Sequence, residues 1–310
     1  MDNLGAHMSI QGGLHEALIR GKAVGCGVVQ IFLKNQVQWA AKPLTPDEIA
    51  AFKQAQRETG IRTVFAHDTY LINLGSPNET DWKRSMDTFF VEMERAEAVE
   101  VPYLVFHPGA HMGAGPAAGI RRIARALNLL LRRGRGFRVR LLLENTAGQG
   151  SLLGSTFEEL RAIMDGVHES ERLGLCLDTC HLLAAGYDIR DRDGYERTMA
   201  ACDRLIGLEQ VRAFHLNDAK KGLGSHLDRH EHIGKGEVGL EAFRLLMNDH
   251  RFHDVPMALE TPKEGDMDVE NLRVLRNLRA TARPRARRAS RGNRGAGAQS
   301  RSRDERGAAE

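Results

Sequence analysis

A carboxylate and an imidazole follow an apolar run in the second half of the chain. The run from Leu173 to Leu177 has the length and composition of a fully buried strand, and Asp178 follows it directly. His181 comes three residues later, where the chain turns into its next element. Aspartate and histidine are both zinc ligands, so this stretch could bind a metal ion where a strand ends.

Six other apolar runs end in the same way, on a histidine or an acidic residue. These strand-end residues are His7, His67, His107, Glu144, His215 and Glu260. Asp228 and His230 lie in the long loop that follows the run containing His215. A single strand-end histidine is more often a structural group than a ligand, so the prediction rests on how many such residues converge. A mixed set of imidazoles and carboxylates suits zinc, manganese or iron better than magnesium or calcium.

The number of donors predicts more than one metal ion. Four carboxylates crowded into one site would repel each other and raise each other's pKa values, and divalent cations relieve that cost. A catalytic zinc takes three or four protein ligands, so nine donors, with His7 left out, supply three metals if one carboxylate bridges two of them. Side chains two residues apart on an extended loop lie on the same side, so Asp228 and His230 can share a metal with His181.

Eight strand-like runs, each followed by a helical pattern, must position these donors. The expected strands cover residues 3–6, 28–33, 61–66, 103–106, 139–143, 173–177, 211–216 and 256–259. The stretches 45–48 and 155–158 have the sequence of capping boxes and predict two helix starts. Eight such units indicate a closed (β/α)8 TIM barrel, whose active site forms where the strands end. An open doubly wound sheet is disfavoured because no GxGxxG follows the first strand.

The composition changes near the end of the chain. Residues 281–310 contain nine arginines, no lysine and three acidic residues, while residues 1–280 carry 35 basic and 38 acidic residues. The Arg-, Gly-, Ala- and Ser-rich stretch cannot form a core. We therefore expect a catalytic barrel over residues 1–280 and a disordered basic tail over residues 281–310. The tail either adds non-specific nucleic-acid binding or is simply solvated.

The remaining composition predicts a cytoplasmic protein. No apolar run approaches the roughly 20 residues that span a bilayer, and no basic-then-apolar leader precedes the first strand. The four cysteines form no CxxC pair and suit reduced core thiols. We expect no membrane partner, and nothing in the sequence indicates an oligomer, so we expect a monomer.

The motifs around these strand ends resemble those of the endonuclease IV family. The matching segments, in order, are residues 5–7, 106–111, 143–148, 177–181, 185–188, 214–218, 228–230 and 233–236, within a match over about 3–278. The resemblance implies a TIM barrel with three zinc ions that cleaves double-stranded DNA 5′ to abasic sites. The expected products are a 3′-hydroxyl and a 5′-deoxyribose phosphate, and a 3′-phosphodiesterase activity is expected as well.

The resemblance also assigns roles to the donors. It gives the first zinc His67, His107 and Glu144, the second Asp178, His215 and Glu260 with Glu144 as a bridge, and the third His181, Asp228 and His230. Glu144 and Glu260 are the expected catalytic carboxylates. His7 is expected to lie beside the ligands without binding a metal.

Two loops are expected to contact DNA. Tyr70 and Leu71 match the family's loop that wedges into the base stack where the abasic nucleotide flips out. Asn35 and Gln38 belong to the second loop. The family usually has Arg between the two glutamines of that loop, whereas this chain has Val37, so we expect weaker or differently distributed DNA binding there.

Two rival functions remain at this point. A metal-dependent sugar isomerase or epimerase of the same barrel superfamily would also use donors at the strand ends. Such an enzyme needs only one or two metals, so the third set (His181, Asp228 and His230) would have no role. A non-catalytic nucleic-acid-binding protein acting through its tail would leave nine converging donors unexplained.

Overall fold

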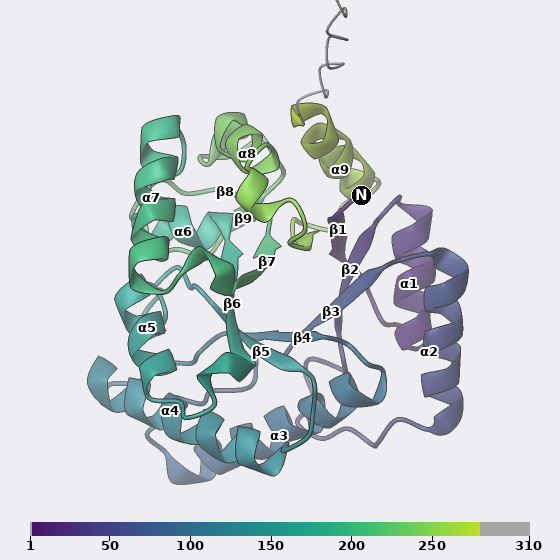
Figure 1. The fold of residues 1–310 in the computed structure, drawn as a ribbon, viewed down its shortest axis with the longest axis vertical. Coiled ribbons are helices and arrows are strands. Elements are labelled where there is room, and N and C mark those ends of the chain that lie inside the picture. Colours follow the sequence, from purple (N-terminus) through teal and green to yellow (C-terminus); the bar gives the residue numbers. More distant parts are fainter. Residues whose placement is uncertain (1, 280–310) are drawn as a thin grey trace, which may run out of the picture. The chain divides into compact units, whose positions relative to one another are not determined.

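Eight parallel strands close into a barrel in this computed structural model, which describes residues 2–279 (Figure 1). The strands, in chain order, are β1 (Leu4–His7), β2 (Val28–Phe32), β3 (Thr63–His67), β4 (Tyr103–Phe106), β5 (Arg140–Glu144), β6 (Leu173–Asp178), β7 (Val211–His215) and β10 (Met257–Leu259). Around the barrel they follow the order β1-β10-β7-β6-β5-β4-β3-β2. The predicted TIM barrel is confirmed; the predicted basic tail, 281–310, lies outside the described residues.

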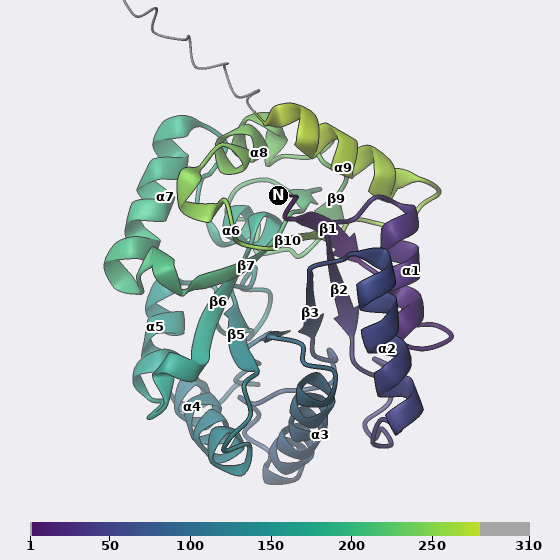
Figure 2. The ribbon, with the colours of Figure 1, turned by 45° about the vertical axis from the view of Figure 1, so that its right-hand side comes forward.

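Helices surround the strands, as Figures 1 and 2 show from two directions. They are α1 (Leu14–Ala23), α2 (Pro46–Thr59), α3 (Glu79–Ala98), α4 (Pro116–Arg133), α5 (Phe157–Asp165), α6 (Thr179–Ala185), α7 (Arg192–Leu205), α8 (Gly239–Met247) and α9 (Met267–Leu278). An ion pair between Arg276 and Asp2, 2.7 Å from Nη2 to Oδ2, fastens α9 to the start of the barrel. Within residues 2–279 no helix is long and apolar enough to cross a bilayer.

One of the two predicted capping boxes is confirmed, and the other forms only in part and one residue later. Thr45 accepts a hydrogen bond from the Glu48 amide at 3.2 Å, and the Glu48 carboxylate accepts one from the Thr45 amide at 2.8 Å. At the start of α5 the cap is Thr156, which accepts from the Glu159 amide at 3.2 Å. Only part of a box forms there, one residue later than the prediction of 155–158. The Glu159 carboxylate accepts from the amides of Gly154 and Ser155, which precede the cap, and not from the amide of Thr156.

The barrel interior is a packed layer of side chains, one from each of seven strands. These residues are Val28, Phe65, Val105, Leu142, Cys176, Ala213 and Ala258. The eighth strand has Gly5 between the outward-facing Leu4 and Ala6, and a Cβ there would lie 1.6 Å from the Val28 carbonyl oxygen. Only glycine allows β1 to approach β2 this closely.

Side chains alternate along a strand, so the residue two positions after each interior one points into the mouth of the barrel. Counting two residues on gives Gln30, His67, His107, Glu144, Asp178, His215 and Glu260. Six of these seven are predicted metal ligands. A layer of polar side chains therefore lies directly above the packed interior layer. It is at the C-terminal ends of the strands, where active sites of this fold lie.

The long segment after β7 contains structure that the sequence did not predict. Strands β8 (Asp218–Ala219) and β9 (His230–Glu231) pair antiparallel and carry His230 back toward the barrel mouth. The short helix α6 was also unpredicted, and it begins directly after β6. All four cysteines are buried and free, as predicted.

Candidate metal centre

Glu144 is the centre of the polar layer. Its side chain is fully buried at the end of β5, and its two oxygens lie close to ring nitrogens of four histidines. These distances are 2.9 Å to His67 Nε2, 3.3 Å to His107 Nε2, 3.2 Å to His181 Nδ1 and 2.9 Å to His215 Nδ1. A carboxylate in this position can contact two cations at once, one through each oxygen.

Three groups of potential ligands surround Glu144. Ligand atoms lie within 4.8 Å of one another in the group His67, His107 and Glu144, and in the group Glu144, Asp178, His215 and Glu260. In the third group, Asp228 lies 3.1 Å from His181 Nε2 and 3.1 Å from His230 Nε2. His181 and His230 also group with Asp178, and Asp228 and His230 with Cys180. The structure therefore brings all nine predicted donors close together, but only the first two expected sets appear as separate groups.

Local structure fixes the relation between Asp178 and His181. Asp178 is the N-cap of α6, and its Oδ1 accepts a hydrogen bond from the His181 amide at 2.8 Å. Asn217 holds the other carboxylate oxygen at 2.6 Å. The first turn of the helix therefore brings His181 Nε2 to within 3.1 Å of Asp228, while its Nδ1 stays 3.9 Å from Asp178 Oδ1.

Most of the histidines are oriented by a hydrogen bond from the ring nitrogen that faces away from the set. His67 Nδ1 donates to the Asp68 carbonyl at 2.7 Å, His181 Nδ1 to the Asn145 carbonyl at 2.9 Å, and His230 Nδ1 to the Glu260 carbonyl at 3.1 Å. A carbonyl only accepts, so each bond places a proton on Nδ1 and makes Nε2 the nitrogen that can bind a metal. The buried Nε2 atoms of His181 and His230 lie 3.1 Å from the Asp228 carboxylate but form no well-directed hydrogen bond among residues 2–279, as expected of metal ligands.

The electrostatics of the site favour positive charge. Burial alone would lower the pKa of His67, but the hydrogen bond and charge of Glu144 outweigh it and raise the pKa to about 9. Burial likewise opposes the charge on His230, yet Asp228 and Asp178 raise its pKa to about 9. Burial would raise the pKa of Glu144, but the charges of His215 and His107 hold it well below its usual range. The same field stabilises a bound divalent cation.

Comparison with known proteins decides the family. A model of the xylose isomerase-like TIM barrel matches residues 19–278. The "Probable endonuclease 4" of Chloroflexus aurantiacus is 52% identical over 280 residues, which cover 90% of this chain and 98% of the relative. This chain belongs to the endonuclease IV family. The "Probable endonuclease 4" of Geobacter sulfurreducens is 51% identical over 279 residues, covering 89% of this chain and 94% of that protein.

Solved structures agree with membership of the endonuclease IV family. Endonuclease IV from Thermus thermophilus superposes with a TM-score of 0.80 at 36% identity, covering 89% of this chain and 98% of that one. A D-tagatose 3-epimerase-like protein gives a TM-score of 0.70 at 18% identity, covering 89% and 96%. At that identity the second likeness shows only a shared fold.

The loops that the endonuclease IV resemblance singled out lie at the rim of the site. Tyr70 is 59% exposed, and its ring centroid lies 5.5 Å from that of His67 and 5.9 Å from that of His107. Leu71 is partly buried. The second loop is exposed from residue 35 to residue 38, and its apolar tip, Val37, is 74% exposed.

Gln30 is a polar member of the site that the sequence analysis missed. Its Nε2 donates to Glu260 at 2.5 Å and to His7 Nδ1 at 2.9 Å, while its Oε1 accepts from His215 Nε2 at 2.6 Å. His7 therefore lies beside the predicted ligands, at 3.7 Å from Glu260. The available signal was a lone polar residue inside the apolar run of β2.

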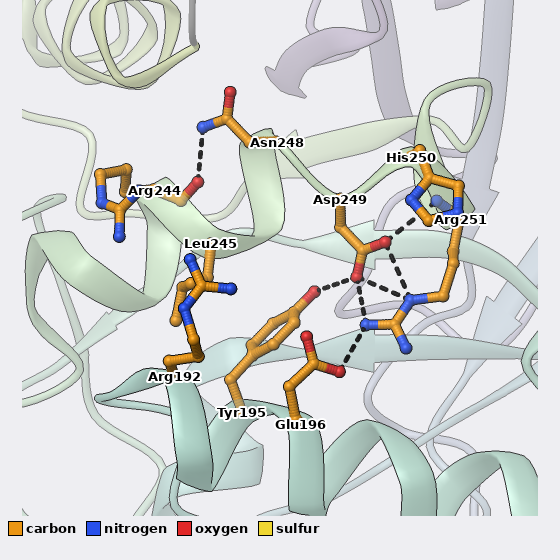
Figure 3. Close-up of a pocket in the computed structure, with 9 residues that line it drawn as sticks. All are labelled: Arg192, Tyr195, Glu196, Arg244, Leu245, Asn248, Asp249, His250 and Arg251. Atoms are coloured by element: carbon orange, nitrogen blue, oxygen red, sulfur yellow. Dashed lines mark hydrogen bonds and ion pairs between the residues drawn. The ribbon is translucent and has the colours of Figure 1, made fainter.

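A separate cavity of about 350 Å³ lies between α7 and α8, away from the metal centre (Figure 3). There Tyr195 donates a hydrogen bond to Asp249 at 2.8 Å, and Arg251 pairs with both Asp249 and Glu196. No predicted site residue lines it. Its carboxylates are already neutralised by arginine, so we place no catalytic site there.

Proposed function

We propose that this protein is a zinc-dependent endonuclease that cuts duplex DNA 5′ to abasic sites, leaving a 3′-hydroxyl and a 5′-deoxyribose phosphate. Membership of the endonuclease IV family makes DNA cleavage the expected reaction, and the proposal adds the metal, the lesion and the products. The observation that carries it is the convergence of nine donors around the buried carboxylate of Glu144.

The residues present fit three zinc ions. His67, His107 and Glu144 would hold the first, Glu144 with Asp178, His215 and Glu260 the second, and His181, Asp228 and His230 the third. When bound, the ions supply Lewis acidity, which lowers the pKa of water and neutralises charge on the phosphate.

The protein's own contribution is to hold the donors in place before substrate arrives. Asn217 illustrates this, because its amide donates to Asp178 while its Oδ1 accepts from the backbone amide of Glu260 at 2.9 Å. One side chain thereby orients one carboxylate and positions the residue that bears another. Donors that need no rearrangement stabilise a developing charge without a reorganisation cost.

Selectivity for abasic over intact nucleotides would come from the shape of the pocket at the rim of the site. A nucleotide without a base leaves the stack at little cost, and a tight pocket excludes an intact one. Tyr70, which is exposed at the rim, would fill the gap that the flipped nucleotide leaves, together with Leu71. Asn35 and Gln38 would contact the backbone from the second loop, where Val37 cannot add charge. The same centre would remove blocking groups from 3′ ends, since that hydrolysis is also attack at a phosphodiester.

Incision of a duplex with one abasic analogue tests the proposal. We expect a cut 5′ to the analogue, none in an undamaged duplex, and loss of activity after prolonged chelation that added zinc restores. Metal analysis of the protein as purified should give three zinc ions per chain. One or two manganese ions, with epimerisation of a ketose and no incision, would favour the sugar-epimerase alternative instead.

Glu144→Gln tests the bridging role. The amide keeps the size of the side chain but removes the charge that two metals would share. We expect zinc stoichiometry to fall and incision to drop by more than the roughly 10–100-fold typical of residues that only orient ligands. Wild-type turnover by this variant would refute the role of Glu144. Glu158→Gln, at an exposed position on α5, is the matched control.

A further inference from the structure

A buried lysine–glutamate pair lies behind the two loops at the rim. Lys34 follows β2, and Glu92 is on α3; their side chains are 2% and 1% exposed, and Lys34 Nζ lies 3.7 Å from Glu92 Oε1. Neither residue belongs to the three ligand sets. The pair connects segments that are far apart in the sequence.

The Lys34 ammonium holds its own loop in a fixed shape. It donates to the carbonyl of Asn35 at 3.4 Å and to the carbonyl of Gln38. The exposed stretch from residue 35 to residue 38 therefore arches over a buried charge. A lysine that binds both ends of a loop restricts how far the loop can move from β2.

Glu92 holds the other loop. Its Oε1 accepts a hydrogen bond from the Thr69 amide at 3.2 Å, and Thr69 precedes Tyr70. The Thr69 hydroxyl in turn donates to the carbonyl of Gln36 at 2.5 Å. Thr69 is thus bonded to the helix and to the second loop at once, so the two loops and α3 form one connected unit.

Burial opposes both charges of this pair. Burial lowers the pKa of Lys34, which Glu92 opposes, and raises the pKa of Glu92, which Lys34 opposes. Glu92 Oε2 also lacks a hydrogen-bond partner among residues 2–279. Apolar side chains often fill such a space at lower cost, so a buried ion pair is weak evidence for stability. Its geometric effect, fixing the two loops relative to each other, is the better-supported role.

We propose that Lys34 and Glu92 are a positioning pair that sets the spacing between Tyr70 and the tip of the second loop for binding of damaged DNA. This inference rests on the proposed function, because the spacing matters only if both loops enter the duplex. The pair contributes to recognition and leaves the hydrolytic step to the metal centre.

Two substrates distinguish an effect on DNA recognition from an effect on hydrolysis. Duplex DNA with an abasic analogue requires the loops, whereas bis(4-nitrophenyl) phosphate needs only the metal centre. For Lys34→Met and Glu92→Gln we expect KM for the duplex to rise about tenfold or more, with kcat changed less than threefold. Turnover of the small phosphodiester should stay within twofold of wild type. The double variant should be little worse than either single one, since both remove the same interaction.

The pair of Asp249 and Arg251 provides the matched control (Figure 3). Asp249→Asn removes a largely buried charge pair far from the rim and should lower thermal stability without raising KM for the duplex. A similar rise in KM in this control would show that any loss of stability weakens DNA binding. Glu92→Gln preserves side-chain volume, so it keeps the test available if Lys34→Met does not fold.

The outcomes distinguish the inference from the proposed function. Wild-type protein that leaves abasic duplex intact would overturn the proposed function and this inference with it. Wild-type incision with an unchanged KM in both variants would overturn this inference alone. An equal loss on both substrates would assign the pair to support of the metal centre, which contradicts a role confined to recognition.

Discussion

At the scale of single residues, the site depends on which ring nitrogen of each histidine carries its proton. Backbone carbonyls settle this for His67, His181 and His230. His215 differs, because its outward nitrogen bonds to a side chain, the Oε1 of Gln30. Its inward Nδ1 then faces Glu144 at 2.9 Å and Glu260 at 3.4 Å. The tautomer of one ligand thus depends on a residue that binds no metal.

Gln30→Leu should weaken the second metal. Without the amide, His215 loses the acceptor that fixes its tautomer and Glu260 loses a donor. Changes of this kind typically reduce metal affinity by about 10–100-fold. Competition with a chromogenic chelator should show one of three zinc ions released early. Gln54→Leu, at an exposed position on α2, is the control, and equal release from both variants would contradict the role of Gln30.

At the scale of elements, alternation along the strands explains both the successes and the failures of the sequence analysis. The strand ends could be predicted because buried parallel strands are continuous apolar runs, and a charge that follows such a run is conspicuous. Gln30 has the same two-residue relation to an interior side chain as Glu144 has to Leu142. Gln30 lies inside an apolar run, whereas the predicted donors follow such runs, so a prediction made from the ends of runs does not include it.

Contacts between distant elements could not be predicted in the same way. Nothing in the sequence of α3 indicates that Glu92, among its several acidic residues, reaches Lys34. The ribbon of β8 and β9 depends on pairing within a long loop, which has no apolar pattern. Helix α6 was missed because its residues are buried on nearly every side and show no amphipathic period.

Asp249, which connects the turn after α8 to Tyr195 of α7, should make the stability of the protein depend on pH. Burial alone would raise the pKa of Asp249, but hydrogen bonds from Arg251 and Tyr195 outweigh it and lower the pKa. A lowered folded-state pKa stabilises the protein above the unfolded value, about 3.9, and that stabilisation is lost as pH falls through the folded value.

Urea unfolding of wild type and Asp249→Asn from pH 7 to pH 3 measures this effect. The difference in free energy of unfolding between them should be largest near neutral pH and should shrink in the acid range. A difference that is independent of pH would show that the Asp249 charge makes no contribution. Because both proteins keep the same metal centre, its own titration cancels in the comparison.

At the scale of the whole molecule, metal binding and folding should be linked. The donors lie at or just after the ends of β3 to β7 and β10, on α6, and on β9 and the loop before it, so ions held by them connect most of the barrel. A ligand that binds only the folded state stabilises it by mass action. Removing zinc should therefore lower the melting temperature, and titrating zinc back should raise it progressively. A melting temperature unaffected by zinc would contradict binding at this centre.

The residues that stabilise the barrel and the residues that could react form two separate layers, one inside the barrel and one at its mouth. Gln30 and six of the nine predicted ligands are each attached two residues above an interior side chain, on the same face of the same strand. Exchanging the upper members leaves the lower ones, and hence the closure of the cylinder, untouched. A barrel built in this way can keep its fold while its sequence changes widely, and it shares that fold with a D-tagatose 3-epimerase-like protein at 18% identity.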